Sequence, residues 1–129
     1  SPLWVGGGTV FGPTPRSHAK DMTRKARQLA VKSALSEKLR ANELIVVDAL
    51  NFDAPKTKEV VKFLAAFNVD GKALIVDGGT ASENTVLSAR NIPGVKAYAP
   101  SGLNIYDIVH YTKLFLTQDA VKKIEEVLA

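Results

Sequence analysis

The sequence contains no cysteine and only two histidines, His18 and His110, among its 129 residues. Without cysteine, the chain cannot form a disulfide scaffold, a catalytic thiol, a cysteine-type zinc site or an iron–sulfur centre. Two imidazoles are too few for a multi-histidine metal centre within one chain. The composition fits a reducing, cytosol-like compartment.

Long hydrophobic runs are also absent. No apolar run approaches the roughly 18 residues that a membrane span needs, and no secretory leader is visible, so we expect no membrane association. The chain opens with Ser1 and Pro2 rather than Met, and we expect a fragment or a processed product. Apolar residues make up 46% and charged residues 23% of the sequence, which is typical of one ordinary globular domain.

Charge is distributed unevenly along the chain. Residues 1–40 contain eight cations and two acids, a net charge of +6, whereas residues 41–129 have a net charge of −2. The eight cations are Arg16, Lys20, Arg24, Lys25, Arg27, Lys32, Lys38 and Arg40. This asymmetry indicates a polyanionic partner for the first third of the chain. The alternative is a helix face that serves only solubility.

Short apolar runs alternate with helical patterns after residue 20. This order predicts an α/β fold with a mainly parallel sheet and flanking helices, a Rossmann-like three-layer arrangement. The expected strands are 44–48, 73–77, 95–99 and 113–116. The expected helices are 21–41, 55–68, 82–91, 104–110 and 117–128, with caps at Asp21, Asp53, Ser82, Asn104 and Thr117. Residues 44–47 and 73–76 are apolar throughout, and each run ends at an aspartate, which predicts strands buried on both faces.

Residues 1–20 predict an extended, basic arm rich in glycine and proline, and residues 21–129 the α/β domain. The glycines of the arm do not have the spacing of a P-loop or of a dinucleotide-binding turn. Trp4 and Phe11 are interleaved with Arg16, His18 and Lys20. Aromatic rings stack on unpaired bases and cations bind phosphate, so this pattern favours RNA. The alternative is that both rings pack against their own domain.

A different class of function remains open at the ends of the predicted strands. Asp48, Asp77 and Gly78–Thr80 fit the crevice of an α/β nucleotide- or phosphate-binding enzyme domain. Strand-end aspartates commonly satisfy turn backbone instead, and no nucleophile or third ligand accompanies them, so we favour a structural role. Asp107 and His110 are spaced for a local hydrogen bond. A third hypothesis is a protein-binding module that uses the acidic part of the domain.

Several ordered segments resemble the bacterial large-subunit ribosomal protein four family. The most specific is the Gly-Gly-Gly-x-x-Phe-Gly-Pro-x-Pro-Arg run that ends at Arg16. The other matching segments begin at Gln28, Lys56, Lys72, Leu87, Gly102, Lys113 and Ala120. The resemblance covers essentially the whole chain. It departs from the family at Val5, where many members have Arg, and at Lys20–Lys25, where Asp21 stands and the usual proline is lost.

The resemblance implies the C-terminal portion of a structural constituent of the large ribosomal subunit, without the family's N-terminal segment and most of its long extended loop. It implies binding to large-subunit ribosomal RNA and neighbouring ribosomal proteins in the cytoplasm, with no catalysis, cofactor, metal or small-molecule substrate. Residues 6–8 match the segment that threads close to RNA. Together with the residue patterns, it gives these expected RNA contacts: Trp4, Gly6, Gly7, Gly8, Phe11, Arg16, His18, Lys20, Arg24, Lys25, Arg27 and Lys32.

Overall fold

The computed structural model describes residues 1–79 and 82–129 and confirms the α/β fold. In chain order the elements are α1 (Arg24–Arg40), β1 (Leu44–Val47), α2 (Thr57–Ala66), β2 (Ala73–Val76), α3 (Ser82–Ala89), β3 (Val95–Tyr98), the 3₁₀ turn η1 (Pro100–Gly102), α4 (Ile105–His110), β4 (Lys113–Thr117) and α5 (Gln118–Leu128). In the described part of the chain, no helix has the length and apolar character to cross a membrane.

The four strands form one parallel sheet in the order β1-β4-β2-β3. The last strand of the sequence therefore lies between the first and the second, where Leu114 pairs with Leu44 on one side and Leu74 on the other. Strand β2 is buried throughout, as predicted. Strand β1 is not, because it forms an edge of the sheet and Val46 is 51% exposed. The prediction of a doubly buried first strand was wrong.

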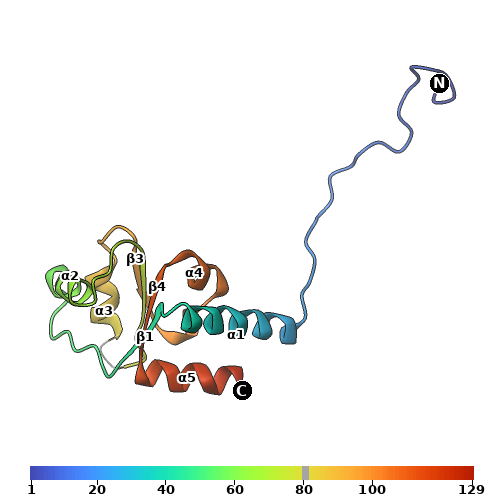
Figure 1. Ribbon diagram of the computed structural model, residues 1–129. Helices are drawn as coiled ribbons and strands as arrows, with labels where there is room; N and C mark the ends of the chain where they lie inside the picture. The colour runs from blue at the N-terminus through green and yellow to red at the C-terminus, as the bar shows by residue number, and fades with distance from the viewer. Residues whose placement is uncertain (80–81) are drawn as a thin grey trace.

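Helices cover both faces of the sheet and give the predicted three layers (Figure 1). Helices α2 and α3 cover one face, where Phe115, Ile75 and Val60 belong to one buried cluster. Helices α1 and α5 cover the other, where Leu74, Leu114 and Ile124 belong to a second cluster. Burying apolar side chains on both faces is what stabilises a parallel sheet.

Helix α1 is held loosely, since none of its 17 residues is fully buried. Its contact with the domain comes from half-buried positions such as Val31 and Leu35. The helix begins three residues later than predicted. The Thr23 side chain, and not Asp21, accepts a hydrogen bond from the Ala26 amide at the start of the helix.

The other predicted helix caps are confirmed in some cases and wrong in others. Asn104 and Thr117 accept hydrogen bonds at the starts of α4 and α5, as predicted. Helix α2 starts after Lys56 without a side-chain cap, so the prediction of Asp53 was wrong. The side chain of Ser82 lies outside the described residues.

Residues 1–23 contain no helix or strand and run away from the domain at the N-terminal end of α1 (Figure 1).

Candidate nucleic-acid interface

The first helix presents unpaired cations to solvent. Arg24, Lys25, Arg27 and Lys32 are all exposed, and within the described residues none of them forms an ion pair. At 100° per residue, Arg24 and Arg27 lie on one flank of the helix and Lys25 and Lys32 on another. These four side chains are free to meet an anionic partner without first breaking a contact with their own protein.

Lys38, which the helical spacing places on the same flank as Arg27, is different. Its Nζ lies 2.8 Å from Glu43 Oε2 and donates to the backbone carbonyls of Tyr111 at 2.8 Å and Thr112 at 3.2 Å. The side chain is only 12% exposed. Lys38 is therefore a structural residue. Its spacing from Val31 and Leu35, the half-buried positions of α1, is the sequence feature that could have revealed this.

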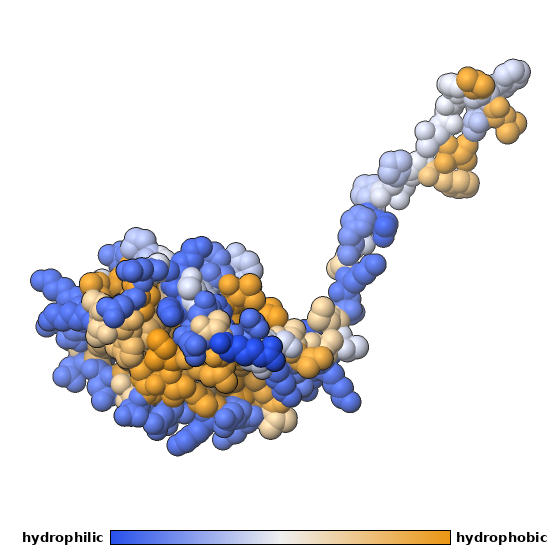
Figure 2. All heavy atoms as spheres, in the orientation of Figure 1, coloured by the Kyte–Doolittle hydropathy of each residue, from blue (hydrophilic) through white to orange (hydrophobic). Residues whose placement is uncertain are grey.

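The N-terminal segment holds the other expected contacts, all exposed apart from the half-buried Gly12 beside them. Arg16, His18 and Lys20 form no ion pair with any part of the chain that the structure describes. Figure 2 shows hydrophilic residues on the part of the segment nearest the domain and hydrophobic ones towards the N-terminus. The rings of Trp4 and Phe11 are 75% and 100% exposed, so neither packs against the domain.

Glycine has a clear geometric role in the first turn of this segment. The amide of Trp4 donates to the Ser1 carbonyl at 3.2 Å and the amide of Gly7 to the Trp4 carbonyl at 2.9 Å. Gly6 has a φ of +72°, which favours glycine, and a Cβ on Gly7 would run into the Ser1 carbonyl. A Cβ on Gly8 meets nothing within 4 Å. Gly6 and Gly7 therefore shape a turn, whereas Gly8 has no such requirement within its own chain.

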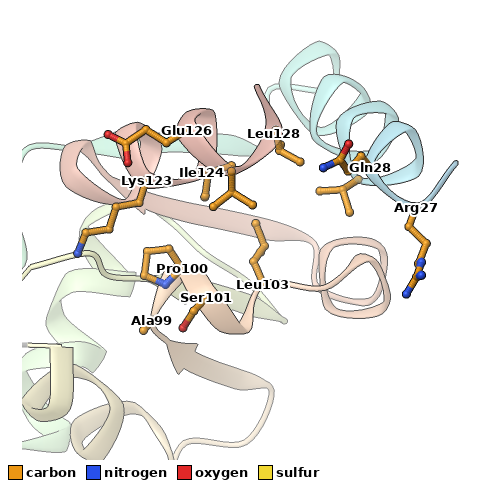
Figure 3. A pocket seen from close by; sticks show the side chains of 12 residues that line it. Arg27, Gln28, Ala99, Pro100, Ser101, Leu103, Lys123, Ile124, Glu126 and Leu128 are labelled. Carbon is orange, nitrogen blue, oxygen red and sulfur yellow. The ribbon is translucent and has the colours of Figure 1, made fainter. Parts of the chain in front are cut away.

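An open hollow of about 560 Å³ lies between α1, η1 and α5 (Figure 3). Its wall is mostly apolar and includes Val31, Pro100, Leu103 and Ile124. Arg27 stands at its outer end, pointing away from Leu128 (Figure 3). Its charged lining residues are Arg27, Lys123 and Glu126. The Lys123 ammonium donates to the Gly78 carbonyl at 2.7 Å, so Arg27 is the lining cation for which no such bond is seen among the described residues.

The strand-end crevice proposed for the enzyme alternative is present as a second hollow, of about 620 Å³, lined by both Asp48 and Asp77. Asp77 is buried, and its two carboxylate oxygens accept hydrogen bonds from the Gly79 amide and the Thr85 hydroxyl, each at 2.9 Å. Asp48 accepts from Gln118 Nε2 at 2.6 Å. Thr80 lies outside the described residues. Both carboxylates are therefore used by the turn and by α5.

Gly78 has a packing role in this crevice rather than an anion-binding one. Its amide donates to Thr117 Oγ1 at 3.0 Å, and a Cβ at this position would lie 2.5 Å from the backbone nitrogen of Ala120. Within residues 1–79 and 82–129, no group of three or more acidic or histidine side chains is arranged to hold a metal ion. The crevice has the features of a tight strand-to-helix turn.

A polar cluster that the sequence did not reveal supports α4. Asp107 is buried, and Oδ2 of its carboxylate accepts from Lys96 Nζ at 3.1 Å and Asn104 Nδ2 at 2.9 Å. Burial raises the pKa of Asp107, but the hydrogen bonds from Lys96 and Asn104 outweigh it and hold the pKa below its ordinary value. Burial and the neighbouring Asp107 charge raise the pKa of Tyr98.

The expected hydrogen bond between Asp107 and His110 was wrong, because the buried carboxylate faces Lys96 on β3. His110 instead lies on the outer side of α4, where its ring stacks on Tyr106, with centroids 5.6 Å apart and planes 14° from parallel. The i, i+4 spacing of Tyr106 and His110 is the sequence feature that would have indicated this pair.

These observations define an α/β protein whose first helix and N-terminal segment present unpaired cations and exposed aromatic rings. The chain belongs to the Ribosomal protein L4/L1 family, whose model matches residues 1–127. The resemblance found in the sequence is thereby confirmed.

Relatives of known identity match along the whole chain. It is 60% identical over all 129 residues to large ribosomal subunit protein uL4 of Lactobacillus acidophilus and of Lactobacillus helveticus. It is 55% identical over the same length to large ribosomal subunit protein uL4 of Alkaliphilus oremlandii. The chain spans 62% of the length of each of these relatives.

Proposed function

We propose that this chain is a structural part of the large ribosomal subunit and binds ribosomal RNA through residues 1–20 and the exposed cations of α1. The proposal is supported by family membership and by the names of the relatives, each a large ribosomal subunit protein. Its partners on this proposal are large-subunit ribosomal RNA and neighbouring ribosomal proteins, and its place is the ribosome of the cytoplasm.

The observation that carries the RNA contact is the state of the cations. Six of them (Arg16, Lys20, Arg24, Lys25, Arg27 and Lys32) are exposed, and among the described residues they have no acidic partner. A cation that has no ion pair within the protein can neutralise a phosphate of the RNA. The counterions that were condensed on that phosphate are then released into solution, which favours binding. The six cations all lie within residues 16–32, so one stretch of RNA backbone can contact several of them together.

The exposed rings of Trp4 and Phe11 add a second kind of contact. Bases that are not paired within the RNA stack on aromatic side chains, whereas phosphates bind cations. The segment has both, with the rings towards its N-terminus and the cations towards α1. On this proposal His18 binds phosphate or stacks on a base, and Gly8 allows RNA to approach the backbone closely.

The proposed role involves no turnover. The two carboxylates that a nucleotide-binding enzyme would use are hydrogen-bonded to Gln118, Gly79 and Thr85. The protein acts on this proposal by filling and bridging folded RNA, with the α/β domain serving as the rigid body from which α1 and the N-terminal segment extend.

The test is a salt-dependent titration of the chain against large-subunit ribosomal RNA, with an unrelated folded RNA of equal length as competitor. We expect preferential binding to the ribosomal RNA that survives moderate salt. Arg16→Ala and Arg27→Ala should each weaken binding and reduce the slope of log K against log salt by about 0.7 to 0.9, one phosphate contact each.

Lys58→Ala and Lys62→Ala are matched controls. Both residues are exposed cations on α2, on the opposite face of the sheet. Each control removes the same charge as Arg27→Ala and should leave the salt slope unchanged. Equal reductions in slope for all four variants would mean that binding follows net charge alone, and would contradict the assignment to residues 1–20 and α1.

A further inference from the structure

Helix α4 presents a paired set of rings to solvent. Tyr106 is 72% exposed and His110 is also exposed, and their rings stack nearly parallel along the outer side of the helix. Ile105 and Val109, one residue before each ring, are 40% and 69% exposed. The four exposed positions of this six-residue helix therefore carry two aliphatic side chains and two rings, which is unusual for a surface that meets only water.

The helix that supports these rings is firmly anchored from below. Asp107 and Ile108 are buried, and Asp107 is bound by Lys96 and Asn104. The chain that leaves α4 is held by Lys38, which donates to the carbonyls of Tyr111 and Thr112. A planar surface on a fixed backbone loses little conformational freedom when it binds a partner.

Helix α4 packs against the helix that carries the unpaired cations. The flank of α1 that begins with Arg27 continues through the half-buried Val31 and Ala34 and ends at Lys38, whose ammonium reaches the end of α4. Arg27 lies at the exposed end of this flank and points away from the apolar lining of the hollow between α1 and α5 (Figure 3).

We infer that the Tyr106–His110 stack is a binding surface for an unpaired base of RNA, continuing the cationic surface of α1 onto α4. The inference rests on the proposed function and adds to it a contact outside residues 1–40. The rings are stacked and exposed, and their helix packs against the helix that carries the unpaired cations. Proteins bind single-stranded nucleic acid by combining aromatic rings with cations in this way. An apolar protein surface that covered α1 together with α4 would have to bury Arg27, which has no acidic partner among the described residues.

The test uses Tyr106→Ala in the same titration against large-subunit ribosomal RNA. Loss of one stacked base should weaken binding about 5- to 150-fold, the equivalent of roughly 1 to 3 kcal/mol. The salt slope should stay at the value of the unaltered chain, because no cation is removed. Tyr106→Phe keeps the ring and should bind as the unaltered chain does.

Leu87→Ala is the control for loss of an exposed apolar side chain, since Leu87 lies on α3 on the opposite face of the sheet and is 41% exposed. It should leave RNA affinity unchanged. Circular dichroism and the unfolding midpoint should be the same for Tyr106→Ala and the unaltered chain, since the ring makes its only described ring contact with His110.

The outcomes separate the two proposals. If Arg27→Ala lowers the salt slope while Tyr106→Ala binds normally, the function stands and the base-stacking surface on α4 is wrong. If Tyr106→Ala leaves RNA binding intact but abolishes association with another ribosomal protein, the surface is a protein interface and the inference is overturned. If the unaltered chain shows no preference for ribosomal RNA, both proposals are overturned together.

Discussion

The ammonium of Lys38, near the end of α1, donates to the backbone carbonyl of Tyr111 at 2.8 Å, although the two residues are 73 positions apart in the sequence. The same ammonium pairs with Glu43 and reaches Thr112. One lysine thus joins α1 to the start of β1 and to the segment between α4 and β4. Of the six cations of α1, Lys38 holds the fold, Arg40 lies 3.7 Å from Glu37, and the other four have no ion pair among the described residues.

Replacing Lys38 with methionine should therefore destabilise the protein. Lys38→Met leaves the Glu43 carboxylate and two backbone carbonyls without their donor, and we expect the free energy of unfolding to fall by about 1 to 3 kcal/mol. Urea denaturation measures this change. Lys32→Met removes an exposed cation from the same helix and should change stability by less than about 0.5 kcal/mol. Equal effects of the two substitutions would contradict a structural role for Lys38.

Asp107 should make the protein sensitive to acid. Its pKa is below the ordinary value of 3.8, so the stability that its charge contributes is fully present above that value and is lost as the pH falls through the lowered pKa. We expect Asp107→Asn to reduce the free energy of unfolding at neutral pH by roughly 1 to 3 kcal/mol. The difference from the unaltered chain should shrink as the solution is acidified.

Denaturant unfolding at a series of pH values measures this convergence. Asp70→Asn, at an exposed position, is the matched control and should follow the curve of the unaltered chain. A difference between Asp107→Asn and the unaltered chain that stays constant down to the most acidic pH tested would show that the pairing with Lys96 contributes nothing through charge.

Gly78 should tolerate no side chain, for reasons of packing. A Cβ there would lie 2.5 Å from the Ala120 nitrogen and 2.8 Å from its Cα, and both are backbone atoms of α5 that cannot move independently. We expect Gly78→Ala to lower the unfolding midpoint, at a cost of about 1 to 3 kcal/mol. Gly12→Ala is the control, because its Cβ meets only the Thr9 methyl at 3.6 Å. An unchanged midpoint for Gly78→Ala would mean that β2 and α5 can separate without penalty.

Gly8 should affect RNA binding without affecting the fold. Its Cβ would meet nothing within 4 Å, so Gly8→Ala should leave the unfolding midpoint unchanged. If RNA passes close to the backbone here, the added methyl should weaken binding several-fold while the salt slope stays the same, since no charge is lost. Full affinity for Gly8→Ala would contradict a close approach of RNA at this glycine.

The local features of the sequence predicted the elements well. The alternation of apolar runs and helical patterns gave the four strands and five helices within a few residues, and the side-chain oxygens of Asn104 and Thr117 cap the helices that they were predicted to cap. Strands, helices and their caps depend on residues that are close in the chain, so short stretches of sequence are enough to predict them. Asp21 and Asp53 failed as caps because any short polar residue near a helix start has the same pattern.

The candidate site was less predictable, because ionic pairing depends on contacts between distant segments. By composition Lys38 and Arg27 are equivalent, and only the return of the chain at residues 111–112 makes Lys38 a structural residue. The sequence spacing predicted a hydrogen bond between Asp107 and His110, whereas in the structure the Asp107 carboxylate accepts a hydrogen bond from Lys96. The packing of α4 against α1 was likewise beyond any local pattern.

By itself, the sequence determined the α/β alternation, the parallel sheet, the basic first third and the family. Each of these follows from composition, from periodicity or from an ordered set of short matches along the chain. Only the tertiary structure decided that β4 lies between β1 and β2, which leaves β1 at the edge with Val46 exposed. The reason is physical. Strand order and ion pairing depend on which apolar faces and charges from distant parts of the chain come together on folding. The same local pattern of residues is compatible with several such arrangements.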